Sequence, residues 1–493
     1  MSVLAIDAGT TGVTALVVGR DGGVLARGYQ EFPQHFPRPG WVEHSPEEIW
    51  QAALAACQTA LAAAPEQPTC VGLTNQRETA VFWDRETLAA PRRAIVWQDR
   101  RTAGLCEHLH DAGHEEMVAE ITGLRLDPYF TGTKLAWVRE HEPALWQRVE
   151  AGQVAVGTVD SYLVARLTRG ARHVTDATNA SRTLLFDLVA GAWSPAMCAL
   201  LGVPASALPE VVPSYGEIGH TDPTAFLGLA LPIAGIAGDQ QAALFGQTCF
   251  EPGELKCTYG TGSFLLVNTG DQPVRSQAGM LTTVALGRPD GSLGYALEGA
   301  IFVTGAAVQW LRDGLGLIQS AGETEPLART VPDTGGVVFV PALTGLGAPD
   351  WDPTARGTIL GITRGTTRAH LVRATLEAIA YEVRDVVDAA LVGPLAGLAG
   401  RPLRVDGGAA ANDLLCELQA ATLGVPVERP AVLETTGLGA AFLAGLGTGV
   451  WSSLDELRAT SRLQRRFEPG PRDDAGYRRW REAVQRAKGW AAG

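Results

Sequence analysis

The chain begins with two apolar runs that are separated by a tight turn of small and hydroxylated residues. Residues 3–7 and 13–18 have the composition of β-strands, and Ala8-Gly9-Thr10-Thr11-Gly12 joins them. Asp21-Gly22-Gly23 then marks a second turn that leads into a third strand. The pattern therefore predicts a β-hairpin and a third strand at the start of the chain.

A helix is predicted directly after Ser45. Ser45-Pro46-Glu47-Glu48 combines a capping box with proline at the first helical position. Apolar residues then recur at helical spacing, at Ile49, Trp50, Ala53, Leu54, Cys57 and Leu61. A short buried strand at 69–73 follows the helix and leads into Asn75-Gln76-Arg77-Glu78.

A run similar to the first turn occurs half-way along the chain. Ile6-Asp7-Ala8-Gly9-Thr10-Thr11 is matched by Thr258-Tyr259-Gly260-Thr261-Gly262-Ser263, so that Thr10 and Thr261 are 251 residues apart. An apolar, strand-like run follows each copy. This repeat predicts two related halves, each opening with a hairpin whose Gly/Thr turn faces the other.

The second half repeats the alternation of strands and amphipathic helices. Strands are predicted at 337–341 and 403–406, with a helix at 367–391 and another from about Ala409. Strands interleaved with amphipathic helices indicate the α/β class, with two domains and a cleft between them.

The length of the chain also favours two domains. At 493 residues the chain is too long for one hydrophobic core. Phe250-Glu251-Pro252-Gly253 has the composition of a linker turn. We therefore expect one domain over residues 1–248 and a second over residues 249–493.

The formal net charge of −13 excludes some classes of partner. A basic footprint for nucleic acid is absent, and no polybasic run favours anionic membranes. Gly, Pro or a charge interrupts every apolar stretch before about 18 residues, so no membrane insertion is expected. Seven scattered cysteines without a Cys-x-x-Cys pair, and an N-terminus without a basic leader, are typical of a cytoplasmic protein.

The first turn is a candidate phosphate site. Gly9 allows the backbone to approach a phosphate closely, and the hydroxyls of Thr10 and Thr11 can bond to phosphate oxygens. Asp7, at the end of the strand, can hold Mg²⁺ directly or through water. An ordinary hairpin contains the same residue types, so both interpretations stay open.

The run Gly407-Gly408-Ala409-Ala410-Ala411-Asn412 joins a predicted strand to a predicted helix. Small residues at this point admit an adenine or a phosphate against a helix N-terminus. No Gly-Lys-Ser/Thr follows, so the run is not a P-loop, and it lacks the dinucleotide glycine fingerprint. An ordinary tight turn between a strand and a helix is the alternative.

Asp239 is the most informative acidic residue. Apolar and small residues bracket it on both sides, from Gly235 to Gly246, which is unusual for a solvated surface charge. As a general base, Asp239 can take the proton of an attacking hydroxyl during phosphoryl transfer. A role as the N-cap of a helix is the alternative.

Arg77 and Glu78 follow the predicted buried strand at 69–73. An adjacent cation and anion can grip vicinal hydroxyls, because arginine donates and glutamate accepts hydrogen bonds. A salt bridge to the surrounding protein is the alternative. Trp97 is a candidate to pack against the C–H face of a substrate.

Seven ordered runs strengthen these motifs: Gly40-Trp41-Val42-Glu43-His44, Thr74-Asn75-Gln76-Arg77-Glu78-Thr79, Asp127-Pro128-Tyr129-Phe130-Thr131-Gly132-Thr133-Lys134, Thr175-Asp176-Ala177-Thr178-Asn179-Ala180-Ser181-Arg182-Thr183, Gly238-Asp239-Gln240-Gln241, Thr258-Tyr259-Gly260-Thr261-Gly262 and Thr344-Gly345-Leu346-Gly347-Ala348-Pro349. Together they resemble the FGGY family of carbohydrate kinases, and within it the members that phosphorylate glycerol. The resemblance extends from about Leu4 to Trp480.

The resemblance implies two actin-like, ribonuclease-H-like α/β domains that flank an interdomain active-site cleft. It also implies ATP with Mg²⁺, glycerol as acceptor, and a homo-oligomer, either a dimer or a tetramer. The residues implied for glycerol are Arg77, Glu78, Trp97, Tyr129, Asp239, Gln240 and Phe264, with Asp239 as the base. Those implied for the nucleotide are Thr10, Thr11, Gly12, Thr261, Gly305, Gln309, Gly408 and Asn412. Asp7 and Asp239 are implied for the metal.

Two stretches depart from the pattern of the family. Glycerol-phosphorylating members usually have Asp-Gln-Gly-Thr-Thr-Ser-Ser-Arg at the first turn, whereas this chain has Thr14 in place of the arginine. Threonine cannot supply that charge near the phosphates. In residues 219–228, the stretch that matches a fructose 1,6-bisphosphate loop has no Arg or Lys. We therefore expect this feedback to be absent or weak.

Two other functions remain open from the sequence. A kinase for another polyol or ketose, such as erythritol or a pentulose, would share most of these motifs. A non-catalytic, actin-like ATP switch would keep the nucleotide residues alone, so the presence of Asp239, Arg77 and Glu78 together argues against it.

Overall fold

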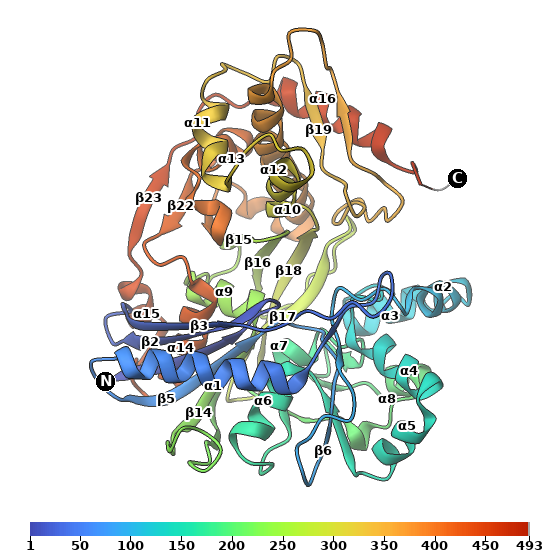
Figure 1. Ribbon diagram of the computed structural model, residues 1–493, viewed down its shortest axis with the longest axis vertical. Helices are drawn as coiled ribbons and strands as arrows, with labels where there is room; N and C mark the ends of the chain where they lie inside the picture. The colour runs from blue at the N-terminus through green and yellow to red at the C-terminus, as the bar shows by residue number, and fades with distance from the viewer. Residues whose placement is uncertain (492–493) are drawn as a thin grey trace.

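Two mixed β-sheets, one in each half of the chain, organise the molecule (Figure 1). The computed structural model describes residues 1–491. The first sheet has the order β13 (Tyr215–His220), β14 (Pro232–Gly238), β5 (Pro68–Asn75), β1 (Ser2–Ala8), β2 (Gly12–Gly19) and β3 (Val24–Glu31). The second has the order β17 (Leu281–Gly287), β18 (Leu293–Ile301), β16 (Ser263–Gly270), β15 (Leu255–Tyr259), β21 (Leu403–Asp406), β22 (Val427–Pro430) and β23 (Leu463–Phe467).

Helices and short two-stranded pairs surround the sheets. The helices of the first half are α1 (Pro46–Ala63), α2 (Ala103–Asp111), α3 (Glu115–Thr122), α4 (Thr131–His141), α5 (Pro143–Glu150), α6 (Val159–Leu167), α7 (Ala177–Ala180), α8 (Pro195–Leu201) and α9 (Asp239–Gly246). Those of the second half are α10 (Gly305–Gln309), α11 (Thr324–Ala328), α12 (Arg368–Ala390), α13 (Asp413–Leu423), α14 (Thr435–Gly447), α15 (Leu454–Thr460) and α16 (Asp474–Ala487). The strand pairs are β4 (Glu43–His44) with β7 (Ala94–Ile95), β6 (Val81–Asp84) with β8 (Val154–Gly157), β9 (Val174–Asp176) with β12 (Glu210–Val212), β10 (Phe186–Asp187) with β11 (Ala192–Trp193), and β19 (Val338–Val340) with β20 (Thr358–Leu360).

The predicted repeat is confirmed as a pair of equivalent hairpins. The turn between β1 and β2 is closed by Gly9 N–H donating to the Gly12 carbonyl at 3.0 Å. The turn between β15 and β16 is closed by Gly260 N–H donating to the Gly262 carbonyl at 2.8 Å. β1 is also parallel to β5, as β15 is to β21. The two halves therefore share a core topology.

The helix α14 returns from the second half to pack against the first sheet and α9 (Figure 1). Its approach to α9 is very close, because a Cβ on Gly439 would lie 1.8 Å from the Ala242 carbonyl oxygen. The buried side chains Leu438, Phe442 and Leu443 share a hydrophobic cluster with the first strands. The predicted division at residue 248 lies between α9 and β15, but part of the later sequence completes the first core.

Two helix starts differ from the sequence prediction. Ser45 accepts from the Glu48 N–H at 3.4 Å, but the Glu48 carboxylate bonds to His35 at 2.9 Å, so only half of the capping box forms. A 3₁₀ turn occupies 408–411, and α13 begins only at Asp413, because Asn412 serves as its N-cap. Local sequence propensity predicted that both helices exist, and hydrogen bonds to nearby polar groups determine the residue and the capping contacts at which each one begins.

Within residues 1–491, no helix combines the length and the apolar character needed to span a membrane. The seven cysteines in this described part of the chain are all buried and none is in a disulfide.

Candidate active site

Three neighbouring parallel strands end at one edge of the first sheet, and candidate residues follow each of them. Ala8 of β1 lies beside Asn75 of β5, and Asn75 lies beside Gly238 of β14. In open α/β sheets, ligands bind beyond the carboxyl ends of the strands. The register brings three candidate groups to this edge: Asp7, residues 76–78 and Asp239.

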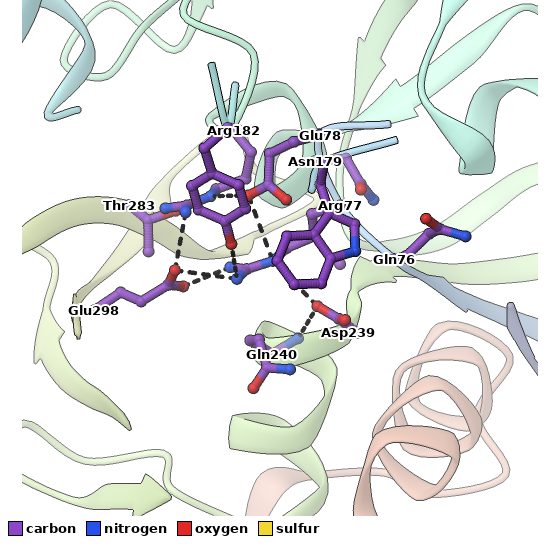
Figure 2. A network of polar contacts seen from close by, with 12 residues as sticks. Gln76, Arg77, Glu78, Asn179, Arg182, Asp239, Gln240, Thr283 and Glu298 are labelled. Carbon is purple, nitrogen blue, oxygen red and sulfur yellow. Dashed lines mark hydrogen bonds and ion pairs between the residues drawn. The ribbon is translucent and has the colours of Figure 1, made fainter. Parts of the chain in front are cut away.

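Arg77 is the centre of the candidate site, and its side chain is only 2% exposed (Figure 2). Its terminal nitrogens donate to Glu298, with Nη1–Oε2 at 2.5 Å and Nη2–Oε1 at 3.0 Å. Nη1 also donates to Gln241 Oε1 at 3.1 Å, and Nε lies 3.1 Å from Asp239 Oδ1. The bidentate pair with Glu298 fixes the plane of the guanidinium, so that Nε faces the candidate base.

Glu298 and Arg182 complete this buried cluster, although neither is among the site residues predicted from the sequence. Arg182 donates to Glu78 Oε1 at 2.7 Å and to Glu298 Oε1 at 2.9 Å (Figure 2). Burial raises the pKa of Glu298, but Arg182 and Arg77 outweigh burial and hold that pKa below its usual value. Glu298 could have been recognised from the sequence, because it is a glutamate inside the apolar strand 293–301 and a buried charge needs a partner.

Glu78 has an uncommon backbone conformation. Its φ is +61°, in the left-handed region. The Thr79 N–H donates to the Arg77 carbonyl at 2.8 Å and closes a three-residue γ-turn around it. Holding a non-glycine residue there costs on the order of 1–3 kcal/mol, and such strain is concentrated at functional sites. The carboxylate is thereby turned toward Arg182 rather than toward Arg77 Nε, which lies 3.8 Å away.

Aromatic side chains form the apolar wall around Arg77. The Trp97 ring lies edge-on to Tyr129, with centroids 5.7 Å apart, and edge-on to Phe264, with centroids 6.3 Å apart. Arg77 lies over the Phe264 ring at 5.9 Å and donates to the Tyr129 hydroxyl at 3.4 Å. The structure therefore brings all three predicted aromatic residues together, and Phe264 comes from the second half of the chain.

Asp239 is the first residue of α9, and the residue at the N-cap is Gly238, so the alternative interpretation of Asp239 as an N-cap is wrong. Asp239 Oδ1 accepts from the Gln240 N–H at 2.7 Å. The side chain of Asp239 is 27% exposed, which leaves it accessible to a ligand. Burial raises its pKa, while Arg77 and Lys256 oppose that rise.

Lys256 is a further buried charge beside the candidate site, and it was not predicted from the sequence. Its Nζ donates to Gln240 Oε1 at 2.5 Å and to Thr258 Oγ1 at 2.8 Å. Because the amide oxygen of Gln240 is used in this way, its NH₂ group is the part left to donate to a ligand. Lys256 could also have been recognised from the sequence, because it is a cation within the apolar strand 255–259.

Asp7 and Asp239 repel each other at the ends of β1 and β14. Burial and the charge of Asp239 raise the pKa of Asp7 to about 7. Two such carboxylates fit Mg²⁺, which in phosphoryl-transfer sites is held by one or two carboxylates and by substrate phosphates. Residues 1–491 contain no cluster of three or more His, Cys, Asp or Glu side chains suited to a metal ion. Water and phosphate oxygens would supply the other ligands.

A cavity of about 440 Å³ opens in the second half, between the β15–β16 turn and the helices α10 to α13. Five residues predicted to contact the nucleotide line it: Thr261, Gly305, Gln309, Gly408 and Asn412. Leu376, Ile379 and Arg312 also line it, although they are not among the nucleotide residues predicted from the sequence. A cavity with apolar walls, a polar rim and a helix N-terminus suits a purine nucleotide.

The turn 407–408 that borders this cavity requires glycine. Gly407 has φ +83°, and a Cβ there would lie 2.5 Å from the Tyr259 carbonyl oxygen. Asn412 caps α13 by accepting from the Leu415 N–H at 2.9 Å, and it donates to Thr324 Oγ1 at 3.0 Å. The strand-to-helix turn is therefore both a tight connection and part of the cavity wall.

Three other predicted nucleotide residues, Thr10, Thr11 and Gly12, lie outside this cavity in the part of the chain that the structure describes. They form the turn of the first hairpin, where Trp97 Nε1 donates to Thr10 Oγ1 at 2.9 Å. Thr14 lies opposite Asp7 in the β1–β2 register. Arg20 follows the far end of β2 and pairs with Glu456 at 3.1 Å, so it does not replace the family's arginine.

The loop 219–228 has no Arg or Lys of its own, but guanidinium groups from α6 and the turn after it lie close by. Arg169 Nη1 donates to Thr224 Oγ1 at 3.5 Å, and Arg166 and Arg169 line a shallow pocket with Thr224. Asp222 holds the loop by accepting from the Thr224 N–H at 2.7 Å. The expectation of weak feedback therefore rests on the loop's sequence and not on the charge of its surroundings.

Sugar and polyol kinases have a two-domain α/β fold of this kind, with equivalent Gly/Thr hairpins and a nucleotide-sized cavity. Residues 2–246 match the N-terminal domain of the FGGY family of carbohydrate kinases, and residues 255–448 match its C-terminal domain. The chain belongs to this family. The predicted fold class is thereby confirmed.

Individual similar proteins show which members of the family this chain resembles. The glycerol kinase of Aromatoleum aromaticum is 55% identical, over 99% of each chain. Plasmodium falciparum glycerol kinase with ADP is 33% identical in sequence, with 99% of this chain and 98% of that chain covered and a TM-score of 0.89. The xylulose kinase of Rhodospirillum rubrum is 26% identical, with 99% of both chains covered and a TM-score of 0.84. The fold is thus shared by kinases of different substrates, whereas high identity is found with glycerol kinases.

Proposed function

We propose that this protein transfers the γ-phosphoryl group of ATP to glycerol and releases sn-glycerol 3-phosphate and ADP. The observation that carries the proposal is the position of Asp239, which lies beside Arg77 at the carboxyl ends of three parallel strands. The 55% identity with a glycerol kinase over the whole chain supports the choice of acceptor.

Asp239 is the general base in this proposal. The carboxylate takes the proton of the attacking hydroxyl while the new bond to phosphorus forms and the bond to the ADP oxygen breaks. Burial raises the pKa of Asp239, which makes its carboxylate a stronger base, and the charges of Arg77 and Lys256 oppose that rise. The 3.1 Å contact with Arg77 holds the carboxylate in one orientation.

The remaining hydroxyls of glycerol are bound by paired polar groups. Arg77 donates and Glu78 accepts, and the 3.4 Å contact between Arg77 and the Tyr129 hydroxyl is long enough to be replaced by a substrate hydroxyl. Gln240 donates through its NH₂ group, and the rings of Trp97 and Phe264 pack on the carbon chain. A site built for hydroxyl groups rejects analogues that lack one by large factors.

The nucleotide is bound between the two hairpins. Thr261, Gly305, Gln309, Gly408 and Asn412 hold the part that enters the large cavity, and Thr10, Thr11 and Gly12 contact the phosphates from the first domain. Asp7 and Asp239 would hold Mg²⁺, which would neutralise charge on the phosphates. The two domains, each built around one of the two sheets, then close on the substrates and exclude water, the competing nucleophile.

The test is substrate-dependent ADP formation, with and without Mg²⁺. Glycerol should give turnover that requires the metal, and Asp239→Asn should reduce kcat by about 10²–10⁴-fold while glycerol binding persists. Asp222→Asn, on the surface loop, is the matched control and should keep full activity. Wild-type turnover with glycerol that is no faster than the background hydrolysis of ATP would refute the proposal.

A kinase for another small polyol or a ketose is the second candidate, because the fold is shared with xylulose kinase. A panel of glycerol, erythritol and pentuloses in the same assay distinguishes the two by kcat/KM. Nucleotide binding without turnover on any acceptor would indicate the ATP switch instead. We also propose a cytoplasmic homo-oligomer, a dimer or tetramer, which sedimentation measures directly.

A further inference from the structure

A chain of hydrogen bonds runs from the first phosphate turn to His44, and the proposed mechanism does not use it. Gln34 Nε2 donates to the Thr10 carbonyl at 2.6 Å, and Gln76 Nε2 donates to the Gly9 carbonyl at 3.0 Å. His44 joins the two glutamines, with Nε2 2.7 Å from Gln34 Oε1 and Nδ1 3.2 Å from Gln76 Nε2. The backbone of the turn is thus held from both sides through one imidazole.

The pattern of donors determines the tautomer of His44. The Gln34 oxygen can only accept, so the proton of the neutral ring is on Nε2 and Nδ1 is the acceptor for Gln76. Burial and the charge of His35 lower the pKa of His44 to about 4, so the ring stays neutral at physiological pH. The ring therefore fixes which end of each amide faces the phosphate turn.

The same chain continues from Gln76 to Trp97 and returns to the turn. Thr79 Oγ1 donates to Gln76 Oε1 at 2.8 Å, and the Trp97 N–H donates to Thr79 Oγ1 at 3.3 Å. Trp97 Nε1 closes the circuit by donating to Thr10 Oγ1 at 2.9 Å. Because this oxygen accepts from the indole, the hydroxyl proton of Thr10 is left to donate to a phosphate.

Burial makes the circuit rigid. His44, Gln76 and Thr79 are at most 1% exposed, and the Phe32 ring lies edge-on to His44 at 5.1 Å. Each polar atom that joins the circuit is satisfied by the next, and fully satisfied buried networks specify a single geometry. A purely structural role would hold β4 in place, but it would not require contacts to two successive carbonyls of a phosphate turn.

We propose that His44 is a positioning residue: through Gln34 and Gln76 it holds the Gly9–Thr10 turn, and through Trp97 it couples that turn to the acceptor site. This inference rests on the proposed function, in which the turn contacts ATP phosphates. His44 touches neither substrate in this scheme. Its effect is on the geometry with which the nucleotide is held.

The test compares variants that break different parts of the circuit. His44→Leu removes both contacts, whereas His44→Gln keeps one donor and one acceptor group on a flexible side chain that lacks the fixed geometry of the ring. Gln34→Leu changes a half-buried side chain and leaves the core around His44 intact, so it serves if His44→Leu does not fold. His110→Gln is the matched control, because His110 is exposed on α2 and lies outside the circuit.

His44→Leu and Gln34→Leu should each raise the KM for ATP by about ten- to a hundredfold, the cost of leaving buried polar groups unpaired. The Kd for glycerol without nucleotide should change less than about threefold, and His44→Gln should be intermediate. Wild-type values for ATP in folded His44→Leu or Gln34→Leu, or equal losses for ATP and glycerol, would overturn the inference.

Calorimetry with the imido analogue of ATP separates this inference from the proposed function. Weaker binding of the analogue to His44→Leu, in a protein that phosphorylates no polyol, would support the positioning role while refuting glycerol as the acceptor. Normal turnover of glycerol by the wild type, together with unchanged analogue binding by the variants, would refute the positioning role alone.

Discussion

Arg77 and Glu298 form a bidentate ion pair between the two halves of the chain, with contacts of 2.5 and 3.0 Å and almost no exposure of either side chain. Arg182 reaches the same carboxylate. Residues that were predicted to bind substrate are therefore held in place by a strand of the second sheet. This arrangement links the orientation of Arg77 to the packing of the two halves.

Replacing Glu298 should damage both stability and activity. Glu298→Gln leaves two buried guanidinium groups without their shared anion, so we expect a loss of about 3–5 kcal/mol in the free energy of unfolding. The value of kcat/KM for the polyol should fall by about tenfold or more, because the plane of Arg77 is no longer fixed. Urea unfolding and steady-state kinetics measure the two effects.

The control for that experiment is Glu468→Gln, which removes an exposed partner of Arg466. Exposed ion pairs contribute little, so no measurable change is expected. A stable and fully active Glu298→Gln would show that Arg77 does not depend on this pair.

Asp7→Asn should trade activity for stability. The folded pKa of Asp7 is about 7 and its ordinary value is 3.8, so folding takes up a proton between these limits and stability falls as pH rises through them. We expect Asp7→Asn to raise the Tm at pH 8 and to leave it nearly unchanged below pH ~4. Metal-dependent turnover should fall at every pH. A lower Tm at pH 8 would contradict the cost of burying the charge of Asp7 beside Asp239.

Glu382 on α12 gives a test of stability without a role in the site. It is 8% exposed, and in the described part of the chain its Oε2 has no hydrogen-bond partner. Burial and the charges of Asp385 and Asp350 raise its pKa well above its usual value of 4.5. Stability is therefore lost as pH rises above 4.5, and Glu382→Gln should remove that loss.

Thermal unfolding of Glu382→Gln across pH 5–9 is the measurement. The gain in Tm over the wild type should be small at about pH 5 and should grow toward pH 9. Glu482→Gln, on the exposed side of α16, should follow the wild-type profile. A gain that does not depend on pH would mean that packing, and not the charge, is responsible.

Thr14→Arg should restore a cation to the phosphate site. Thr14 faces Asp7 in the β1–β2 register and is half-buried, so a longer side chain at this position can reach toward the cleft. The KM for ATP should fall several-fold, by about 1 kcal/mol of charge-assisted hydrogen bonding, and the gain should shrink in high salt. Thr14→Gln adds length without charge and should not reproduce the effect; an equal gain with Gln would exclude an electrostatic cause.

Local pattern was enough to predict much of the fold. The strands, the helix after Ser45 and the Gly/Thr turns follow from periodicity and from the conformational freedom of glycine, which act over a few residues. Asp239 could be identified from its near neighbours in the same way, because a carboxylate between apolar runs at the end of a strand is recognisable without knowing its partners. Those features could be identified from the sequence for that reason.

The tertiary structure decided which distant residues share the site. Glu298 and Arg182 meet Arg77 and Glu78 across more than 100 residues of chain, and Lys256 meets Gln240 from the neighbouring strand β15. Helix α14 returns from the second half to complete the first core. In the sequence, Glu298 and Lys256 are charges within apolar runs, and Arg182 is one of several polar residues in the run 175–183. A charged residue within an apolar run indicates that a partner of opposite charge is needed. Which residue is that partner depends on how the two sheets pack, and this packing is a property of the whole chain.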